Sequence, residues 1–183
     1  MLLPADVGGT KTIVALCAPP DAPGAIPRRV RQNTYASGDH ENLEAIVEPS
    51  FADLGAECPA ALDAACFGVA GPVVQGRSET PNLPWVIEAR AIATRFGIRH
   101  VELVNDLVAT AIRAATLSPD DVQVLHAVPP NENRPRSRVL VAAGTGLGES
   151  LLLNVDGRFL PGESEAGHAD WGARTPREIE LLS

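Results

Sequence analysis

Near its N-terminus the chain reads Asp6-Val7-Gly8-Gly9-Thr10-Lys11, a pair of glycines between two short apolar runs. Two adjacent glycines predict a tight turn between two strands, because residues without a Cβ atom let the backbone reverse and approach another group closely. Around such a turn Thr10 offers a hydroxyl, Lys11 a positive charge, and Asp6 a carboxylate that can hold Mg²⁺ directly or through water. A phosphate-binding loop explains this pattern, and so does a hairpin whose Gly-Gly turn is only structural.

A second glycine-rich stretch, Ala143-Gly144-Thr145-Gly146-Leu147-Gly148, also follows an apolar run and precedes a strand-like segment. It repeats the pattern of the first stretch, with glycines and one threonine at a turn between strands. Neither stretch has the spacing of a dinucleotide-binding fingerprint or of a P-loop. The pair is typical of two loops that hold a triphosphate from opposite sides, as in the actin-like ATPase and hexokinase architecture.

Polar residues follow the apolar run 100–104, where Asn105-Asp106 precedes a helix-like segment. Functional groups in α/β proteins commonly lie at the carboxyl ends of strands, so Asp106 is a candidate functional residue that contacts a substrate hydroxyl. An Asp at this place is also a frequent helix N-cap. The two roles are compatible only in part, since a capping carboxylate has less freedom to reach a substrate.

Two further polar groups lie in turn-rich stretches. Glu165 and His168 are three residues apart on a glycine-containing loop, where they offer acceptors and donors for sugar hydroxyls. A polar surface turn explains them equally, whereas a metal site is disfavoured because no further Cys or His follows nearby. Asn82, between two prolines, supplies an amide, and the neighbouring Trp85 is expected in the core.

Periodicity predicts an α/β protein with a mixed sheet. The predicted strands cover residues 2–3 leading into the first turn, 12–17, 29–35, 64–69, 100–104, 122–126, 138–143 and 150–155. The predicted helices cover residues 42–54, 86–96 and 106–116, with a kink or break at Pro49. Gly97 is predicted to end the second helix.

Composition excludes several classes of protein. Of the 183 residues, 45% are hydrophobic and 21% charged, which is typical of a soluble globular chain. The net charge of −8 argues against nucleic-acid and membrane-surface partners, which require basic patches. The three cysteines, Cys17, Cys58 and Cys66, have neither disulfide-framework nor CxxC spacing. Cys17 and Cys66 lie in apolar runs and are expected to be buried free thiols, as suits a reducing cytoplasm.

Five stretches taken together resemble the bacterial glucokinase family: DVGGTK, GVAGPV with TPNLPW, LVNDLVATA, AAGTGLGE and SEAGHADW, between residues 6 and 171. The resemblance implies a hexokinase-type pair of RNase H-like domains with a cleft between them. A domain with a mixed five-stranded sheet would occupy residues 1–115, and the beginning of a second, similar domain residues 116–183. The implied activity is ATP-dependent phosphorylation of D-glucose to glucose 6-phosphate, the entry to glycolysis.

The resemblance also implies roles for single residues. Asp106 would be the general base that faces the 6-hydroxyl of glucose. The implied glucose ligands are Asn82, Asn105, Asp106, Glu165 and His168. The residues implied to hold the ATP phosphates and Mg²⁺ are Asp6, Val7, Gly8, Gly9, Thr10, Lys11, Gly144, Thr145 and Gly146. Mg²⁺ would arrive with ATP, with no direct site made only of protein groups and with Asp6 as a candidate contact. Whether the protein forms a homodimer stays open.

Two alternatives accompany this interpretation. The repressor/ORF/kinase (ROK) family of sugar kinases shares the D-x-G-G-T and E-x-G-H patterns, but it follows the latter with a cysteine-rich zinc cluster. Residues 169–183 contain no Cys, which favours a glucokinase. The other alternative is a catalytically incomplete sugar-binding chain. The family extends past the length seen here with another glucose-binding Glu, an adenine pocket and a final helix, and a chain without them is expected to fold poorly, to bind glucose at millimolar concentration at best and not to turn it over.

Overall fold

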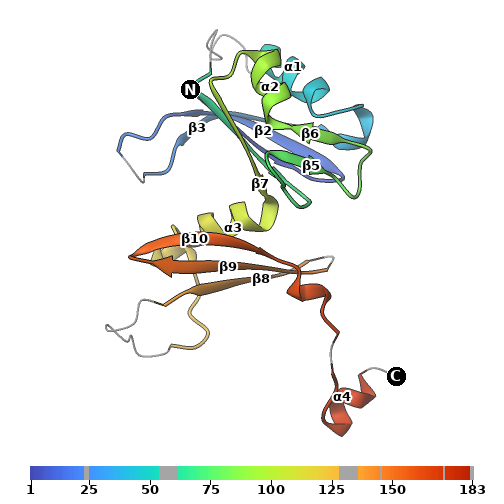
Figure 1. Cartoon of the computed structure of the whole chain (residues 1–183). Coiled ribbons are helices and arrows are strands. Elements are labelled where there is room, and N and C mark those ends of the chain that lie inside the picture. The colour runs from blue at the N-terminus through green and yellow to red at the C-terminus, as the bar shows by residue number, and fades with distance from the viewer. Residues whose placement is uncertain (23–24, 54–61, 128–135, 145, 171, 182–183) are drawn as a thin grey trace.

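The computed structural model describes residues 1–22, 25–53, 62–127, 136–144, 146–170 and 172–181. Its N-terminal part is built on a five-stranded sheet with the strand order β3-β2-β1-β4-β7 (Figure 1). The strands are β1 Leu2–Val7, β2 Lys11–Ala18, β3 Arg28–Ala36, β4 Ala64–Val69 and β7 His100–Asn105. The first three form an antiparallel meander, while β4 pairs in parallel with both β1 and β7. The predicted mixed sheet is confirmed.

One face of this sheet carries the hydrophobic core. Alternate residues of the central strands, among them Leu3, Val14 and Phe67, are fully buried. They pack against Ile46 of α1 (Glu44–Asp53) and Ile92 of α2 (Ala89–Phe96), so both helices cover the same face. The continuous burial on this face fixes the register, because a shift by one residue would turn every apolar side chain outward.

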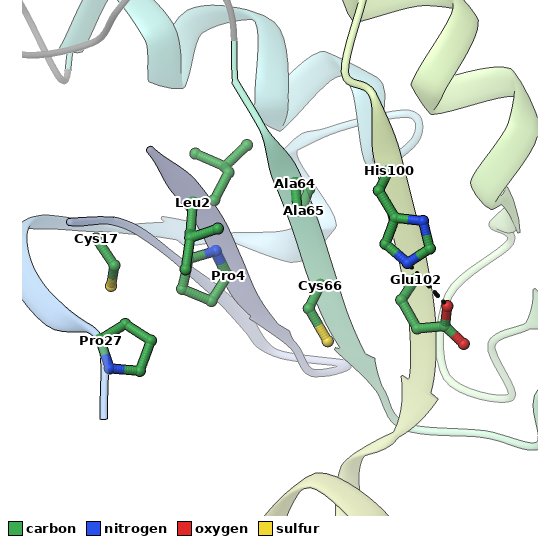
Figure 2. A pocket seen from close by; sticks show the side chains of 10 residues that line it. Leu2, Pro4, Cys17, Pro27, Ala64, Ala65, Cys66, His100 and Glu102 are labelled. Atoms are coloured by element: carbon green, nitrogen blue, oxygen red, sulfur yellow. Dashed lines mark ion pairs between the residues drawn. The ribbon is translucent and has the colours of Figure 1, made fainter. Parts of the chain in front are cut away.

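The opposite face bears an apolar groove of about 420 Å³, which Figure 2 shows from close by. Leu2, Pro4 and Cys66 line it, and none of the predicted site residues does. Cys66 is exposed, contrary to expectation, because it lies on the other side of β4 from the core residues Ala65 and Phe67. Cys17 is buried as expected, and Cys58 lies outside the described residues.

Several predicted elements differ from the observed ones. The segment predicted as one helix over residues 86–96 begins as strand β6 (Val86–Glu88), which pairs with β5 (Arg77–Glu79), and becomes α2 only at Ala89. Gly97 ends α2 with a left-handed φ of 64°, as predicted. The run 122–126 forms no strand, because no described strand pairs with it and its apolar side chains are exposed.

Pro49 and Trp85 were the other two residues with a specific structural expectation, a break or kink in the helix for Pro49 and burial for Trp85. α1 runs as one helix through Pro49, since the buried residues Ile46 and Val47 hold its first turns against the sheet. Trp85 is buried, as expected, and its indole N–H donates to the carbonyl oxygen of His40 at 3.2 Å.

A second sheet follows in the C-terminal part. It is an antiparallel meander of β8 (Arg138–Ala143), β9 (Leu147–Val155) and β10 (Arg158–Ser164), and a short helix, α4 (Pro176–Glu180), comes after it. Helix α3 (Asp106–Ala114) lies between the two sheets and contacts both (Figure 1). Aliphatic side chains such as Val141, Leu151 and Leu153 are exposed on the face of the second sheet that is turned away from α3.

The predicted division into two domains at residue 115 stays a prediction. Within the described part of the chain, no helix is both long and apolar enough to cross a membrane.

Candidate functional site

The first glycine stretch forms the turn between β1 and β2. The N–H of Gly8 donates to the carbonyl oxygen of Lys11 at 3.0 Å, which closes the hairpin. The tip of the β5–β6 hairpin packs on this turn: a Cβ atom added to Gly9 would lie 2.8 Å from the Cβ of Asn82. Glycine is therefore favoured at position 9 by a protein contact, whether or not a ligand approaches the backbone. The same contact places Asn82, a predicted sugar ligand, beside the predicted phosphate loop.

Replacing Gly9 with alanine is expected to lower the free energy of unfolding by about 1–3 kcal/mol, because neither of the two Cβ atoms can move without its backbone. Gly144→Ala is the matched control, since a Cβ atom at Gly144 meets nothing within 4 Å. Urea denaturation of both variants measures the difference. Equal midpoints for the two variants would show that Asn82 does not pack on the turn.

Asn105 and Asp106 stand where β7 ends and α3 begins. Asn105, and not Asp106, is the N-cap: its Oδ1 accepts from the N–H of Leu107 at 3.0 Å and from that of Val108 at 3.2 Å. Its Nδ2 donates to the carbonyl oxygen of Gly71 at 3.1 Å, which ties the helix start to the loop after β4. Asp106 is thereby the first residue of the helix, and its Oδ1 accepts from Leu107 N at 2.8 Å. The capping role considered for Asp106 is thus taken by its neighbour Asn105, and the functional role of Asp106 stays a prediction.

Asp6 and Asp106 lie on the same edge of the sheet. Because β1, β4 and β7 are parallel, their carboxyl ends meet there, with Asp6, Gly68 and Val104 adjacent in register. Both carboxylates line a pocket of about 490 Å³. Although Asp6 is exposed at the surface, desolvation by the surrounding protein raises the pKa of its carboxyl above the ordinary value of 3.8, the negative charge of Asp106 raises it further, and Lys11 offsets part of the rise. Two carboxylates and a cation are therefore close enough to influence one another.

The raised pKa of Asp6 makes the stability of the fold depend on pH. The unfolded chain releases this proton at lower pH than the folded chain, so the free energy of unfolding falls as the pH rises from about 3.8 through the folded-state pKa. Asp6→Asn is expected to remove this loss. The variant should be more stable than the unsubstituted protein at about pH 7, with a difference that shrinks toward about pH 4.

Urea denaturation across that pH range measures the effect, with Asp21→Asn in an exposed segment as the control. A difference that stays constant with pH, or that favours Asp6 at neutral pH, would contradict the assigned direction of the pKa shift.

The second glycine stretch connects β8 to β9. The N–H of Gly144 donates to the carbonyl oxygen of Gly146 at 2.9 Å, and both glycines are exposed. Thr145, a predicted phosphate contact, lies outside the described residues. A Cβ atom added to Gly148 would lie 2.7 Å from Cδ1 of Leu107, the residue after Asp106. The strand that follows the second loop is thus packed against the first turn of α3.

Glu165 precedes a short 3-10 helix, Ala166–His168, and His168 is the last residue of that helix. The His168 N–H donates to the Glu165 carbonyl oxygen at 3.0 Å, and the His168 Nε2 lies 3.6 Å from the Glu165 Oε2. Both side chains are exposed, 83% for His168 and 79% for Glu165. Gly167 between them rests against the carbonyl oxygen of Leu147, where an added Cβ atom would overlap it. The loop that carries Glu165 and His168 therefore packs directly on the start of β9, where the second glycine stretch ends.

The predicted site residues form two groups. Asp6, the Gly8–Lys11 turn, Asn82, Asn105 and Asp106 gather at the carboxyl edge of the first sheet, whereas Gly144, Gly146, Glu165 and His168 gather at the start of β9. Among the described residues, no hydrogen bond or ion pair joins Glu165 or His168 to the first group. The two groups are connected through α3, which packs on the second sheet, for instance where Leu107 meets Gly148. The described residues contain no cluster of three or more His, Cys, Asp or Glu that could hold a metal ion.

Comparison with known proteins gives a consistent result. A family model described as Glucokinase matches residues 3–183. The glucokinase of Nostoc punctiforme is 32% identical over 182 residues, which are 100% of this chain and 51% of that protein. The glucokinase of Yersinia enterocolitica is 31% identical over 178 residues, 97% of this chain and 52% of the relative. The chain thus spans about half the length of these relatives.

Solved structures show the same relation. The crystal structure of a glucokinase from an Antarctic psychrotroph superposes with a TM-score of 0.81 at 28% identity, over 99% of this chain and 55% of the other. The glucokinase of Balamuthia mandrillaris, crystallised in complex with glucose, superposes with a TM-score of 0.62 at 19% identity, over 99% of this chain and 52% of the other. The second likeness, at this identity, concerns the fold alone.

Proposed function

This chain belongs to the glucokinase family, and we propose that it carries the sugar site and the phosphate loops of an ATP-dependent kinase that converts D-glucose to glucose 6-phosphate. The observation that carries the proposal is the carboxyl edge of the first sheet. There the Asp106 carboxylate, at the start of α3, lines the same pocket as Asp6. The glycine turn follows Asp6 and Val7 directly in the chain.

Asp106 is the proposed general base. Its Oδ1 is held by the N–H of Leu107, which fixes the carboxylate at the first turn of α3 and orients it for the 6-hydroxyl of glucose. Phosphoryl transfer requires positioning and charge neutralisation more than a strong base, because the hydroxyl loses its proton as the new phosphorus–oxygen bond forms. We assign the remaining contacts to the sugar hydroxyls to Asn82, Asn105, Glu165 and His168.

The chemistry of the first turn fits a nucleotide phosphate with its metal. Glycine amides and the Lys11 ammonium suit phosphate oxygens, and the carboxylate of Asp6 suits Mg²⁺ through water. MgATP, when bound, supplies the phosphoryl group and neutralises charge on it. Gly8 to Lys11 would hold that group from one side and Gly144 to Gly146 from the other. The expected setting is the cytoplasm, at the entry to glycolysis.

The alternative is a sugar-binding chain without catalysis. The observation that keeps it open is that the chain spans about half the length of its relatives. A ROK-type kinase is disfavoured by the absence of Cys from residues 169–183.

Calorimetric titration with D-glucose, and then with a non-hydrolysable MgATP analogue, tests the proposal on the protein as its gene encodes it. We expect saturable binding of both ligands, with D-galactose binding at least about tenfold more weakly because an epimer leaves a polar group of the site unpaired. If the protein binds glucose but does not bind the nucleotide analogue, the result would favour the sugar-binding alternative. Absence of glucose binding would overturn the proposal.

A further inference from the structure

Ser37 lies beneath the Gly8–Lys11 turn, although it is far from the turn in sequence. It follows the last residue of β3, which pairs with β2 through Ala36 and Lys11. Its Oγ donates to the carbonyl oxygen of Gly8 at 2.7 Å, and its backbone N–H donates to the carbonyl oxygen of Thr10 at 3.0 Å. One residue therefore binds two carbonyl groups of the same turn.

A second hydroxyl supports this arrangement. The Oγ1 of Thr12 lies 2.9 Å from the Oγ of Ser37, and both side chains are fully buried. A serine hydroxyl has one proton, and that of Ser37 is given to Gly8, so Thr12 must be the donor in this contact. The bonds form a directed chain from Thr12 through Ser37 to the Gly8 carbonyl. Such a chain is costly to break, because each buried polar atom would lose its partner.

The chain of hydrogen bonds fixes the orientation of one peptide group. In a planar trans peptide the C=O and the following N–H point in opposite directions. Since the Gly8 carbonyl points at Ser37, the N–H of Gly9 points away from it, on the side of the turn that is not buried against β3. Asn82 packs on the same turn from the β5–β6 hairpin and limits its movement further.

We propose that Ser37, supported by Thr12, is a positioning residue that holds the Gly8–Gly9 peptide so that the Gly9 N–H faces a nucleotide phosphate. This inference rests on the proposed phosphate-binding role of the turn and adds a residue outside the glycine stretch to it. Ser37 touches no substrate itself. It acts by keeping a donor oriented before the phosphate arrives, so that binding need not order the turn.

A matched control separates this role from a purely structural one. Ser50 is also fully buried, and its Oγ donates to a backbone carbonyl oxygen, that of Val47, at 2.7 Å. It lies in α1, on the core face of the sheet. Ser50→Ala therefore removes a bond of the same kind and length as Ser37→Ala, at a place that holds no candidate site residue.

Steady-state kinetics of glucose phosphorylation by the protein as its gene encodes it provide the test. For Ser37→Ala we expect the KM for ATP to rise about tenfold or more while the KM for glucose stays within about twofold. For Ser50→Ala we expect both KM values to stay within about twofold, with a loss of thermal stability that is smaller than for Ser37→Ala, because only Ser37→Ala also leaves the Thr12 hydroxyl without its acceptor. If Ser37→Ala does not fold, Thr12→Val, which keeps the bond from Ser37 to Gly8, is expected to raise the KM for ATP about two- to fivefold.

The outcomes separate the inference from the proposed function. Suppose that the unsubstituted protein turns over glucose and that Ser37→Ala has the same KM for ATP as Ser50→Ala. This result would overturn the role of Ser37 and leave the proposed function intact; Thr12→Val replaces Ser37→Ala in the comparison if the latter does not fold. A proportional rise in the KM for glucose would also overturn the role of Ser37. If the unsubstituted protein phosphorylates no glucose, the proposed function fails, and the positioning role fails with it.

Discussion

Replacing Asp106 with asparagine is expected to lower kcat for glucose phosphorylation by about 10²–10⁴-fold and to leave glucose affinity nearly unchanged. The amide oxygen of asparagine can still accept from the N–H of Leu107, so the first turn of α3 should persist. Asn105 continues to cap the helix in the variant. The substitution therefore removes the group that accepts the hydroxyl proton without removing the local structure.

The control for this variant is Glu102→Gln on β7, the strand that ends just before Asp106. Glu102 is exposed and pairs with His100 at 3.6 Å, and it is not assigned to the site. Its replacement is expected to keep kcat within about twofold. Steady-state rates and calorimetric glucose affinities measure both variants. If Asp106→Asn kept more than about a tenth of the original kcat, Asp106 would not be the base.

Replacing Gly167 with alanine is expected to weaken glucose binding by at least about tenfold and to lower the free energy of unfolding by about 1–3 kcal/mol. The new Cβ atom would overlap the carbonyl oxygen of Leu147, a backbone atom that cannot rotate away. The loop must then move off the start of β9, and it carries Glu165 and His168 with it. Two of the proposed sugar contacts are lost together.

Gly172→Ala is the matched control, since a Cβ atom at Gly172 meets nothing within 4 Å and the residue follows the same loop. It is expected to leave glucose binding unchanged. Calorimetric titration and thermal denaturation of both variants give the comparison. Equal glucose affinities in the two variants would show that the loop around Gly167 does not take part in sugar binding.

Much of the first sheet was predictable because four of its strands, β1, β2, β4 and β7, contain apolar runs that end near glycine or polar turns. The range of β4 matched the prediction at both ends, and so did that of β8. β10 was missed although Asp156-Gly157 gives a strong hairpin signal, and both residues have positive φ in the observed turn. The helix predicted from residue 86 failed at its start because Ile87 pairs with Ser78, a tertiary contact that overrides helical periodicity.

The site was predictable only where its residues lie in local motifs. The sequence pattern indicated Asp106 as a candidate N-cap, whereas the observed N-cap is Asn105; both residue types cap helices, and Asn105 is also tied to the Gly71 carbonyl, which comes from another loop. Ser37 could not be found, since nothing near it in sequence indicates that it bonds Gly8. The packing of Asn82 on Gly9 likewise depends on how the hairpin folds back over the sheet.

The most direct test of the central claim is ³¹P NMR of the protein as its gene encodes it, incubated with ATP, Mg²⁺ and D-glucose. We expect that resonances of glucose 6-phosphate and ADP grow together, that both require glucose, and that Asp106→Asn suppresses both. The Nostoc punctiforme glucokinase, treated identically, serves as the reference. Unchanged ATP, or ATP hydrolysed to free phosphate without sugar phosphate, would contradict the claim that this chain carries the site of a glucose kinase.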